Sequence, residues 1–134
     1  MTLELGQRSE LKIDPISRTT LALFAGAAGD RNPIHIDIDA AHAAGLPDVF
    51  AHGMLSLAYV ARLITSWMPQ KDLIELSVRF TAVTPVHGAP VITGEVAETY
   101  EEDGEQRARL SLIAQLNDGT KTLVGHAIVR NSRG

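Results

Sequence analysis

The second half of the chain alternates between hydrophobic and polar residues in separate runs. Four runs with this period of two predict strands over 74–81, 91–101, 108–116 and 121–130. In the first run, the residues predicted to face the core are Ile74, Leu76, Val78 and Phe80. Turn sequences separate the later runs, at Asp103-Gly104 and at Asn117-Asp118-Gly119. The pattern therefore predicts consecutive antiparallel strands.

The first half of the chain is mostly helical in pattern. Residues 53–68 are hydrophobic on nearly every side, which predicts a helix buried all round. Shorter elements are expected before it: a strand over 8–13, a helix from Ser17 to about Ala28 that Gly29 ends, and a short helix over 39–44. The segments between these helices, 30–36 and 46–51, contain prolines and are predicted to be loops.

Burial decides how these elements combine. A sheet with one hydrophobic face needs a cover, and the long hydrophobic helix needs to be buried. We therefore predict an α+β fold, a curled antiparallel sheet of about five strands wrapped around a long central helix. The 134 residues fit one domain, 1–134. An open sheet leaves an edge strand that a second subunit can pair with.

Composition and charge narrow the possible partners. The net charge of −4 argues against binding to nucleic acid or to an anionic membrane, because both need a basic surface. The hydrophobic stretch over 55–68 is too short to span a bilayer, and Arg62 interrupts it. The N-terminus shows no signal-peptide pattern, and the chain has no cysteine, so we expect a cytoplasmic protein without thiol chemistry.

The densest group of polar residues lies in the loop over 29–35. Asp30 and His35 flank Asn32-Pro33, and the proline stiffens the loop between them. A carboxylate and an imidazole that share one water can move a proton in either direction. Asn32 is a candidate for holding the loop or orienting a substrate. The alternative is that these residues form an ordinary turn and His35 only packs.

A second candidate site is the start of the long helix, Ala51-His52-Gly53-Met54. The first amides of a helix have no partner within the helix, and Gly53 lets a ligand approach the backbone closely. The Gly53 amide is thus a candidate oxyanion donor. Ser56 could support the loop through a hydrogen bond, or it could bond to its own helix. His52 could instead cap the helix.

A metal site is a further alternative. His35, Asp37, Asp39 and His42 offer nitrogen and oxygen ligands in one short segment. Their spacing matches no known ligand pattern, and neighbouring residues of this kind point in different directions. We therefore predict no metal.

Two segments resemble one known family. They are FAGAAGDRNPIH at Phe24–His35 and AHGML at Ala51–Leu55, and both resemble the MaoC-like (R)-specific enoyl-CoA hydratases. VRFTAVTPV at Val78–Val86 is similar to the (3R)-hydroxyacyl-ACP dehydratase subunits. The resemblance implies a hot-dog fold, and a homodimer or a heterodimer with a related subunit. It departs at Ala28, where the family usually has Ser or Thr.

The resemblance also implies an activity: reversible syn hydration of trans-2-enoyl thioesters to (3R)-3-hydroxyacyl thioesters. Asp30 and His35 would be catalytic, Asn32 would support them, and Gly53 would stabilise the oxyanion. No cofactor is expected beyond the CoA or acyl carrier protein that carries the substrate. The alternatives are a (3R)-hydroxyacyl-ACP dehydratase subunit, a thioesterase, or a non-catalytic subunit that shapes a partner's acyl tunnel.

Overall fold

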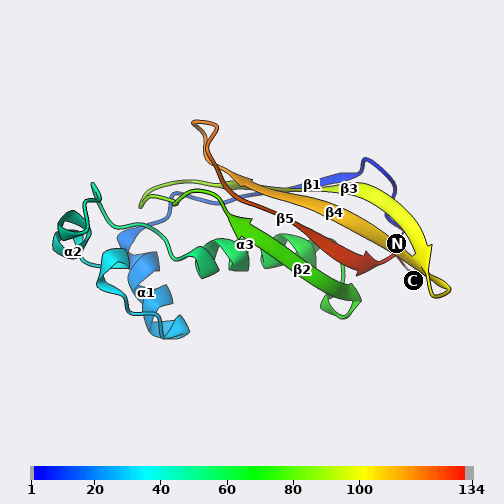
Figure 1. The fold of residues 1–134 in the computed structure, drawn as a ribbon, viewed down its shortest axis with the longest axis horizontal. Helices are drawn as coiled ribbons and strands as arrows, with labels where there is room; N and C mark the ends of the chain where they lie inside the picture. Colours follow the sequence, from blue (N-terminus) through cyan, green and yellow to red (C-terminus); the bar gives the residue numbers. More distant parts are fainter. Residues whose placement is uncertain (1, 132–134) are drawn as a thin grey trace.

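The five strands form one sheet in the order β1-β3-β4-β5-β2, and every neighbouring pair is antiparallel (Figure 1). The computed structural model describes residues 2–131. The strands are β1 (Arg8–Lys12), β2 (Leu73–Phe80), β3 (Val91–Glu102), β4 (Glu105–Gln115) and β5 (Lys121–Arg130). The helices are α1 (Arg18–Ala28), α2 (Ile38–Ala43) and α3 (Gly53–Trp67), with single 3₁₀ turns η1 (Pro33–His35) and η2 (Gln70–Asp72).

The main core lies between α3 and the concave face of the sheet. Val60, Leu63, Ile64 and Trp67 of the helix are buried against the inward-facing residues of the strands. Those strand residues include Ile92, Val96, Leu110, Leu112 and Leu123. Figure 1 shows the sheet curving over the helix along most of its length. The predicted α+β fold, with a curled antiparallel sheet around a long helix, is confirmed.

Strand β2 departs from its predicted alternation. Its pairing with β5 shifts register between Leu73 and Glu75, so Leu73 takes the inward place before Leu76. Ile74 is 37% exposed on the outer face, so the prediction that it faces the core is wrong, whereas Phe80 pairs with the core residue Leu123 and shares its face, although it is 48% exposed. A bulge adds one residue to a strand and so reverses the face on which the preceding side chains lie. Phe80 ends the strand, and its ring lies beside Gly53 at the start of α3.

Helix α3 is buried on one face only. Met54 is 58% exposed and Ala58 is also exposed, whereas Val60 and Ile64 are sealed. The prediction of burial all round is wrong for a single chain, because one sheet can cover only one side of a helix. No helix within residues 2–131 combines the length and the apolar character needed to cross a bilayer.

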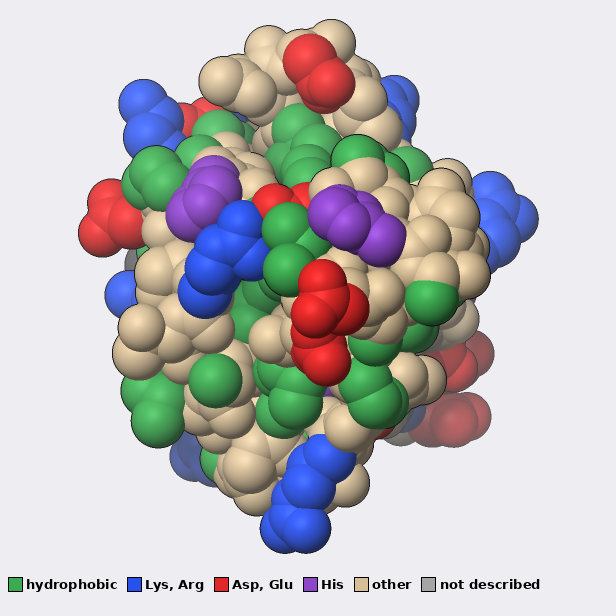
Figure 2. All heavy atoms as spheres, turned by 90° about the vertical axis from the view of Figure 1, so that its left-hand side faces the viewer, with side chains coloured by type: hydrophobic (Ala, Val, Ile, Leu, Met, Phe, Trp, Pro, Cys, Tyr) green, Lys and Arg blue, Asp and Glu red, His purple; other side chains and the backbone are tan. Residues whose placement is uncertain are grey.

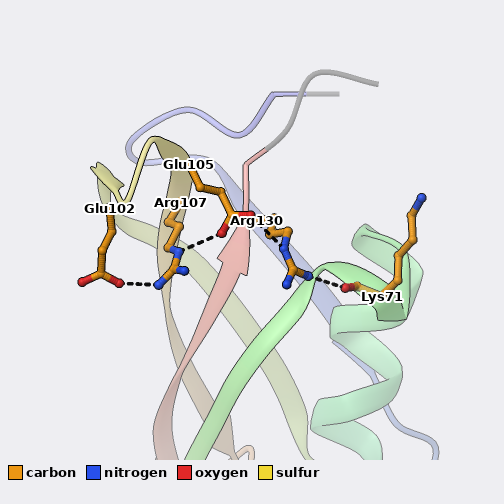
Figure 3. Close-up of polar contacts among 5 residues, drawn as sticks. All are labelled: Lys71, Glu102, Glu105, Arg107 and Arg130. Atoms are coloured by element: carbon orange, nitrogen blue, oxygen red, sulfur yellow. Dashed lines mark hydrogen bonds and ion pairs between the residues drawn. The ribbon is translucent and has the colours of Figure 1, made fainter.

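The end of the sheet near both chain termini is held by polar contacts (Figure 3). Glu105 accepts hydrogen bonds from Arg107 Nε at 2.9 Å and from Arg130 Nε at 3.0 Å. Arg130 Nη1 also donates to the carbonyl of Lys71 at 2.6 Å, and Arg107 pairs with Glu102. These contacts tie β4 and β5 to the turn that precedes β2.

A second, smaller core holds α1 and α2 at the opposite end of the molecule. Its buried members are Ile16, Leu21, Ala41, Val49, Ala51, Leu55 and Val86. Leu55 belongs to the first turn of α3, so this cluster fixes the loops beside the start of that helix. Ser17 caps α1 by accepting from Thr20 N, as the sequence predicts.

Candidate active site

The loop after α1 is shaped by its own side chains. Gly29 ends the helix in the left-handed conformation, with φ of 77°. Asp30 Oδ1 then accepts from the backbone amide of Asn32 at 3.3 Å, and Asn32 Oδ1 accepts from Ile34 N at 3.2 Å. Pro33 begins the turn η1, which carries His35 inward. Asn32 therefore holds the loop through its own side chain, one of the two roles expected for it.

His35 is fixed from the other side by the segment before α3. Its Nδ1 lies 2.8 Å from the carbonyl oxygen of Phe50, and the residue is only 7% exposed. The segment around Phe50 is itself pinned, because Ala51 N donates to Thr84 O at 2.8 Å. The imidazole is thus held between two loops that are separated in the sequence.

This contact sets the tautomer of His35. A backbone carbonyl can only accept a hydrogen bond, so Nδ1 must carry the hydrogen. In the neutral ring, Nε2 then carries a lone pair and can accept a proton. Among residues 2–131, Nε2 has no hydrogen-bond partner, and it is not sealed from solvent. The buried imidazole therefore presents a free base.

The loop geometry brings Asp30 and His35 together, as the sequence predicts. A carboxylate oxygen of Asp30 and one nitrogen each of His35 and His52 all lie within 4.8 Å of one another. His35 is buried and the carboxylate of Asp30 is exposed. A buried base beside an exposed carboxylate is an arrangement in which one water can contact both.

His52 is the residue whose position the sequence did not predict. It is 1% exposed, its Nε2 lies 2.9 Å from the carbonyl oxygen of Asp30, and it makes no capping hydrogen bond. Its ring stacks on that of His35 with the centroids 3.9 Å apart. The clue was its place directly before Gly53, which alone suggested only a cap.

The four residues considered as metal ligands from the sequence, His35, Asp37, Asp39 and His42, do not form one cluster in the structure. Within the described chain, the group with suitable spacing is Asp30, His35 and His52, not the run from His35 to His42. Two of the four imidazole nitrogens in this group already bind backbone carbonyls. The remaining nitrogen of His52 is sealed from solvent. These contacts fit proton transfer better than metal coordination.

Gly53 opens α3 beside a hydrophobic hollow of about 220 Å³. The hollow is lined by Phe50, Ala51, Gly53, Ser56, Phe80, Ala82, Val83, Thr84 and Thr122. A Cβ on residue 53 would lie 3.2 Å from the Phe80 ring, so the glycine permits this close approach. Ser56 is buried and lines the hollow.

A second, wider hollow of about 450 Å³ lies on the outer side of α3. Asp30 contributes its one carboxylate, and the rest of the lining is Phe24, Ala28, Met54, Leu57 and Ala58. Ala28, the departure from the family pattern, therefore leaves a hydrophobic wall beside Asp30. Figure 2 shows the end of the molecule that carries α1 and α2, where hydrophobic side chains are exposed between charged ones.

Comparison with known proteins identifies the family of the chain. A family model described as "MaoC like domain" matches residues 3–118. The chain belongs to the MaoC-like domain family. It is 27% identical to an (R)-specific enoyl-CoA hydratase of Aeromonas caviae over 129 residues, which cover 96% of each chain. It is also 34% identical over 90 residues to 3-hydroxyacyl-thioester dehydratase X of Mycobacterium tuberculosis, covering 67% of this chain and 29% of that protein.

The fold of this MaoC-like chain matches that of solved relatives. The unliganded R-hydratase PhaJ1 from Pseudomonas aeruginosa superposes with a TM-score of 0.86 at 28% identity, over 98% of this chain and 84% of that one. The expected hot-dog fold is thereby confirmed.

Proposed function

We propose that this MaoC-like protein catalyses the reversible syn hydration of trans-2-enoyl thioesters to (3R)-3-hydroxyacyl thioesters. The observation that supports it most is the contact between His35 Nδ1 and the Phe50 carbonyl. It leaves Nε2 of His35 as a proton acceptor, and the Asp30 carboxylate lies within 4.8 Å of one nitrogen of the same imidazole, which is the pairing that activation of a water requires. The similarity to hydratases over nearly the full chain supports the same activity.

In the proposed mechanism, Asp30 and His35 hold one water between them. As the water oxygen attacks C3 of the enoyl group, the pair takes one of its protons. Negative charge moves to the thioester oxygen, where the Gly53 amide stabilises it. The proton then goes to C2 on the same face, which restores the pair and leaves one water added in total. Dehydration follows the same path in reverse.

The hollow behind Gly53 is the proposed site for the acyl group. Its walls are hydrophobic, apart from Ser56, Thr84 and Thr122, and Gly53, whose amide begins α3, is one of the lining residues. A thioester carbonyl at that amide would direct the chain into the hollow. We assign Asn32 and Ser56 to supporting roles, Asn32 through the loop and Ser56 through the lining.

The first alternative is dehydration of 3-hydroxyacyl groups on an acyl carrier protein. The similarity to a 3-hydroxyacyl-thioester dehydratase supports it, and the same residues would serve. A thioesterase or a non-catalytic subunit is less favoured, because the proton-transfer pair is retained and assembled. That no cofactor is needed beyond the substrate's own carrier stays a prediction, as does a cytoplasmic location.

We further propose a dimer, either with a second copy or with a related hot-dog subunit. Strand β2 lies at one edge of the sheet and is eight residues long, whereas β1 at the other edge has five residues. Ile74 and Phe80 leave hydrophobic surface exposed on that strand. An edge of this length with hydrophobic side chains favours pairing with another chain.

The activity is tested with the purified chain alone and crotonyl-CoA. Hydration removes the conjugated double bond, so absorbance of the enoyl thioester should fall at a rate proportional to enzyme. The same assay with a crotonyl group on an acyl carrier protein compares the two carriers. Activity on either thioester excludes the non-catalytic reading, and inactivity on both contradicts the proposed function.

Stereochemistry tests the mechanism more sharply than rate. Two groups acting on one water from one side require oxygen and hydrogen to arrive on the same face of the double bond. Hydration in deuterated water should therefore give a syn-labelled (3R) product, measured by chiral chromatography and by NMR of the label at C2. A (3S) product would contradict the proposed binding orientation, and anti addition would contradict the shared water.

A further inference from the structure

His52 is buried at the centre of the site without being available for chemistry. Its Nε2 bonds to the carbonyl of Asp30 at 2.9 Å, and its Nδ1 is sealed from solvent with no partner among the described residues. One face of its ring stacks on His35 at an interplanar angle of 27°, and the ring of Phe24 lies 5.0 Å away. Neither nitrogen can therefore reach a substrate.

The hydrogen bond fixes which nitrogen carries the hydrogen. The Asp30 carbonyl only accepts, so Nε2 must be the donor and Nδ1 carries the lone pair. The opposite tautomer would set two lone pairs against each other at Nε2 and leave an unpaired N–H buried at Nδ1. The packing around His52 thus allows one tautomer and one orientation.

The position of His52 links the three parts of the site. It precedes Gly53 directly, it bonds to Asp30, which lies 22 residues earlier in the sequence, and it forms a surface on which His35 lies. It occupies the N-cap position of α3 but makes no capping bond. A Ser, Asp or Asn there would cap the helix better, but its side chain is too short to reach the loop as an imidazole does.

We propose that His52 is the positioning residue of the site, which holds the Asp30 loop and the His35 ring in fixed register with the Gly53 amide. This proposal rests on the proposed function. His52 acts through Asp30 and His35 rather than on the substrate. Its loss should lower kcat while leaving KM nearly unchanged, because the acyl hollow does not include it.

Two variants of His52 separate the effect of its hydrogen bond to Asp30 from the effect of its ring stacking on His35. His52→Phe keeps the stacking ring but loses the donor, and it should lower kcat about tenfold to a hundredfold, a part of what a general base contributes. His52→Gln places an amide donor near the former Nε2 and should recover most of that loss. His42→Phe is the matched control, since His42 Nε2 also bonds to a backbone carbonyl, that of Pro47, outside the cluster. It should leave kcat unchanged.

A double variant distinguishes positioning from general stability. In an Asp30→Asn background, adding His52→Phe should lower the residual kcat by less than about threefold, since coupled residues are not additive. Full additivity would overturn the proposal, and so would a fully active His52→Phe variant. In either case the hydratase activity of the unaltered chain would still stand.

A second measurement is independent of activity and of the folding of any variant. Long-range ¹H–¹⁵N NMR of the unaltered protein at a pH of about 8, above the usual histidine range, reports the tautomer of each imidazole. We expect hydrogen on Nε2 of His52 and on Nδ1 of His35. Hydrogen on Nδ1 of His52 would overturn the proposal, whether or not the protein hydrates crotonyl-CoA.

Discussion

Asp30 and His35 are held in different ways, and this affects how each can be tested. Asp30 Oδ1 shapes its own loop by accepting from Asn32 N, whereas His35 donates to the carbonyl of Phe50. Replacing His35 with Ala would leave that carbonyl without its donor, at a cost of about 0.5–1.5 kcal/mol in stability. Variants that keep each hydrogen bond are therefore needed to isolate the chemistry.

Asparagine meets this requirement at both positions. Asp30→Asn keeps the oxygen that accepts from Asn32 N, and His35→Asn keeps a donor near the former Nδ1. In both variants, however, the basic group that could take a proton from water is lost. Each should lower kcat by about 10²–10⁴ with little change in thermal stability, the range typical of general acid–base residues. Asp39→Asn and His126→Asn serve as controls. Near-normal turnover in either test variant would disprove the assignment of that residue.

Gly53 makes a second prediction at the residue scale. An alanine usually stabilises a helix relative to glycine by about 0.5–1 kcal/mol, yet here its Cβ would lie 3.2 Å from the Phe80 ring. Gly53→Ala should therefore lower kcat at least about tenfold, up to the roughly 10²–10³ lost with an oxyanion donor, without lowering the melting temperature. Adding Phe80→Ala should restore part of the activity. A fully active Gly53→Ala variant would exclude close approach at this amide.

The sequence predicted Asp30 and His35 because they share one short loop, where spacing and proline stiffness are visible. It did not predict the contacts of His52, whose partner lies 22 residues away. Local patterns cannot show which carbonyl a histidine reaches once two loops have packed together.

At the scale of elements, one ion pair fastens α1 to the loop before α3. The guanidinium of Arg18 donates to both carboxylate oxygens of Asp48, at 2.9 and 2.6 Å. This pairing, with the amide of Val49, lowers the pKa of the Asp48 carboxyl from 3.8 to about 2. Because the folded pKa lies below the unfolded one, the stabilisation is present above pH 3.8 and is lost as the pH falls toward 2.

The expected result is a stability difference that depends on pH. Asp48→Asn should lower the free energy of unfolding at neutral pH, and the difference from the unaltered protein should shrink as pH falls from about 4 to about 2. Urea denaturation at a series of pH values measures this. High salt should also reduce the difference, since the pair is exposed. A pH-independent difference would contradict this expectation, because it would mean that the charge of the Asp48 carboxylate contributes nothing to stability.

The spacing of hydrophobic residues predicts where the helices and strands lie along the chain. Within residues 2–131, the five strands and the three α-helices all lie close to their predicted positions. The spacing does not predict on which face of the sheet Ile74 of β2 lies. The bulge beside Ile74 is set by pairing with β5, and nothing in the alternation of residues 73–80 shows it.

At the scale of the whole molecule, the outer face of α3 and the edge of β2 remain uncovered in a single chain. The sequence shows that α3 is hydrophobic all round, but it does not show that one sheet would leave Met54 and Ala58 exposed. Residues that look like core in a sequence can thus belong to a surface that only a second chain can bury.

We therefore expect a dimer at micromolar concentration, measured by light scattering. Ile74→Lys, which places a charge on the exposed face of β2, should weaken the dimer at least about tenfold, because a lysine on an edge strand disfavours pairing. Leu5→Lys is the control, because Leu5 is 69% exposed and lies outside β2. A well-folded and fully active monomer of the unaltered chain would contradict this expectation.

The hollow that we propose for the acyl group is lined in part by a different stretch of chain from the one that carries Asp30 and His35. Residues 82–84 follow β2, while residues 30–35 follow α1, and the contact of Thr84 with Ala51 runs through backbone atoms. Side chains at Ala82 and Val83 can therefore vary without disturbing that contact. We therefore expect that substitutions at Ala82 and Val83, whether natural or engineered, change the preferred length of the acyl group and leave the proton transfer by Asp30 and His35 unchanged.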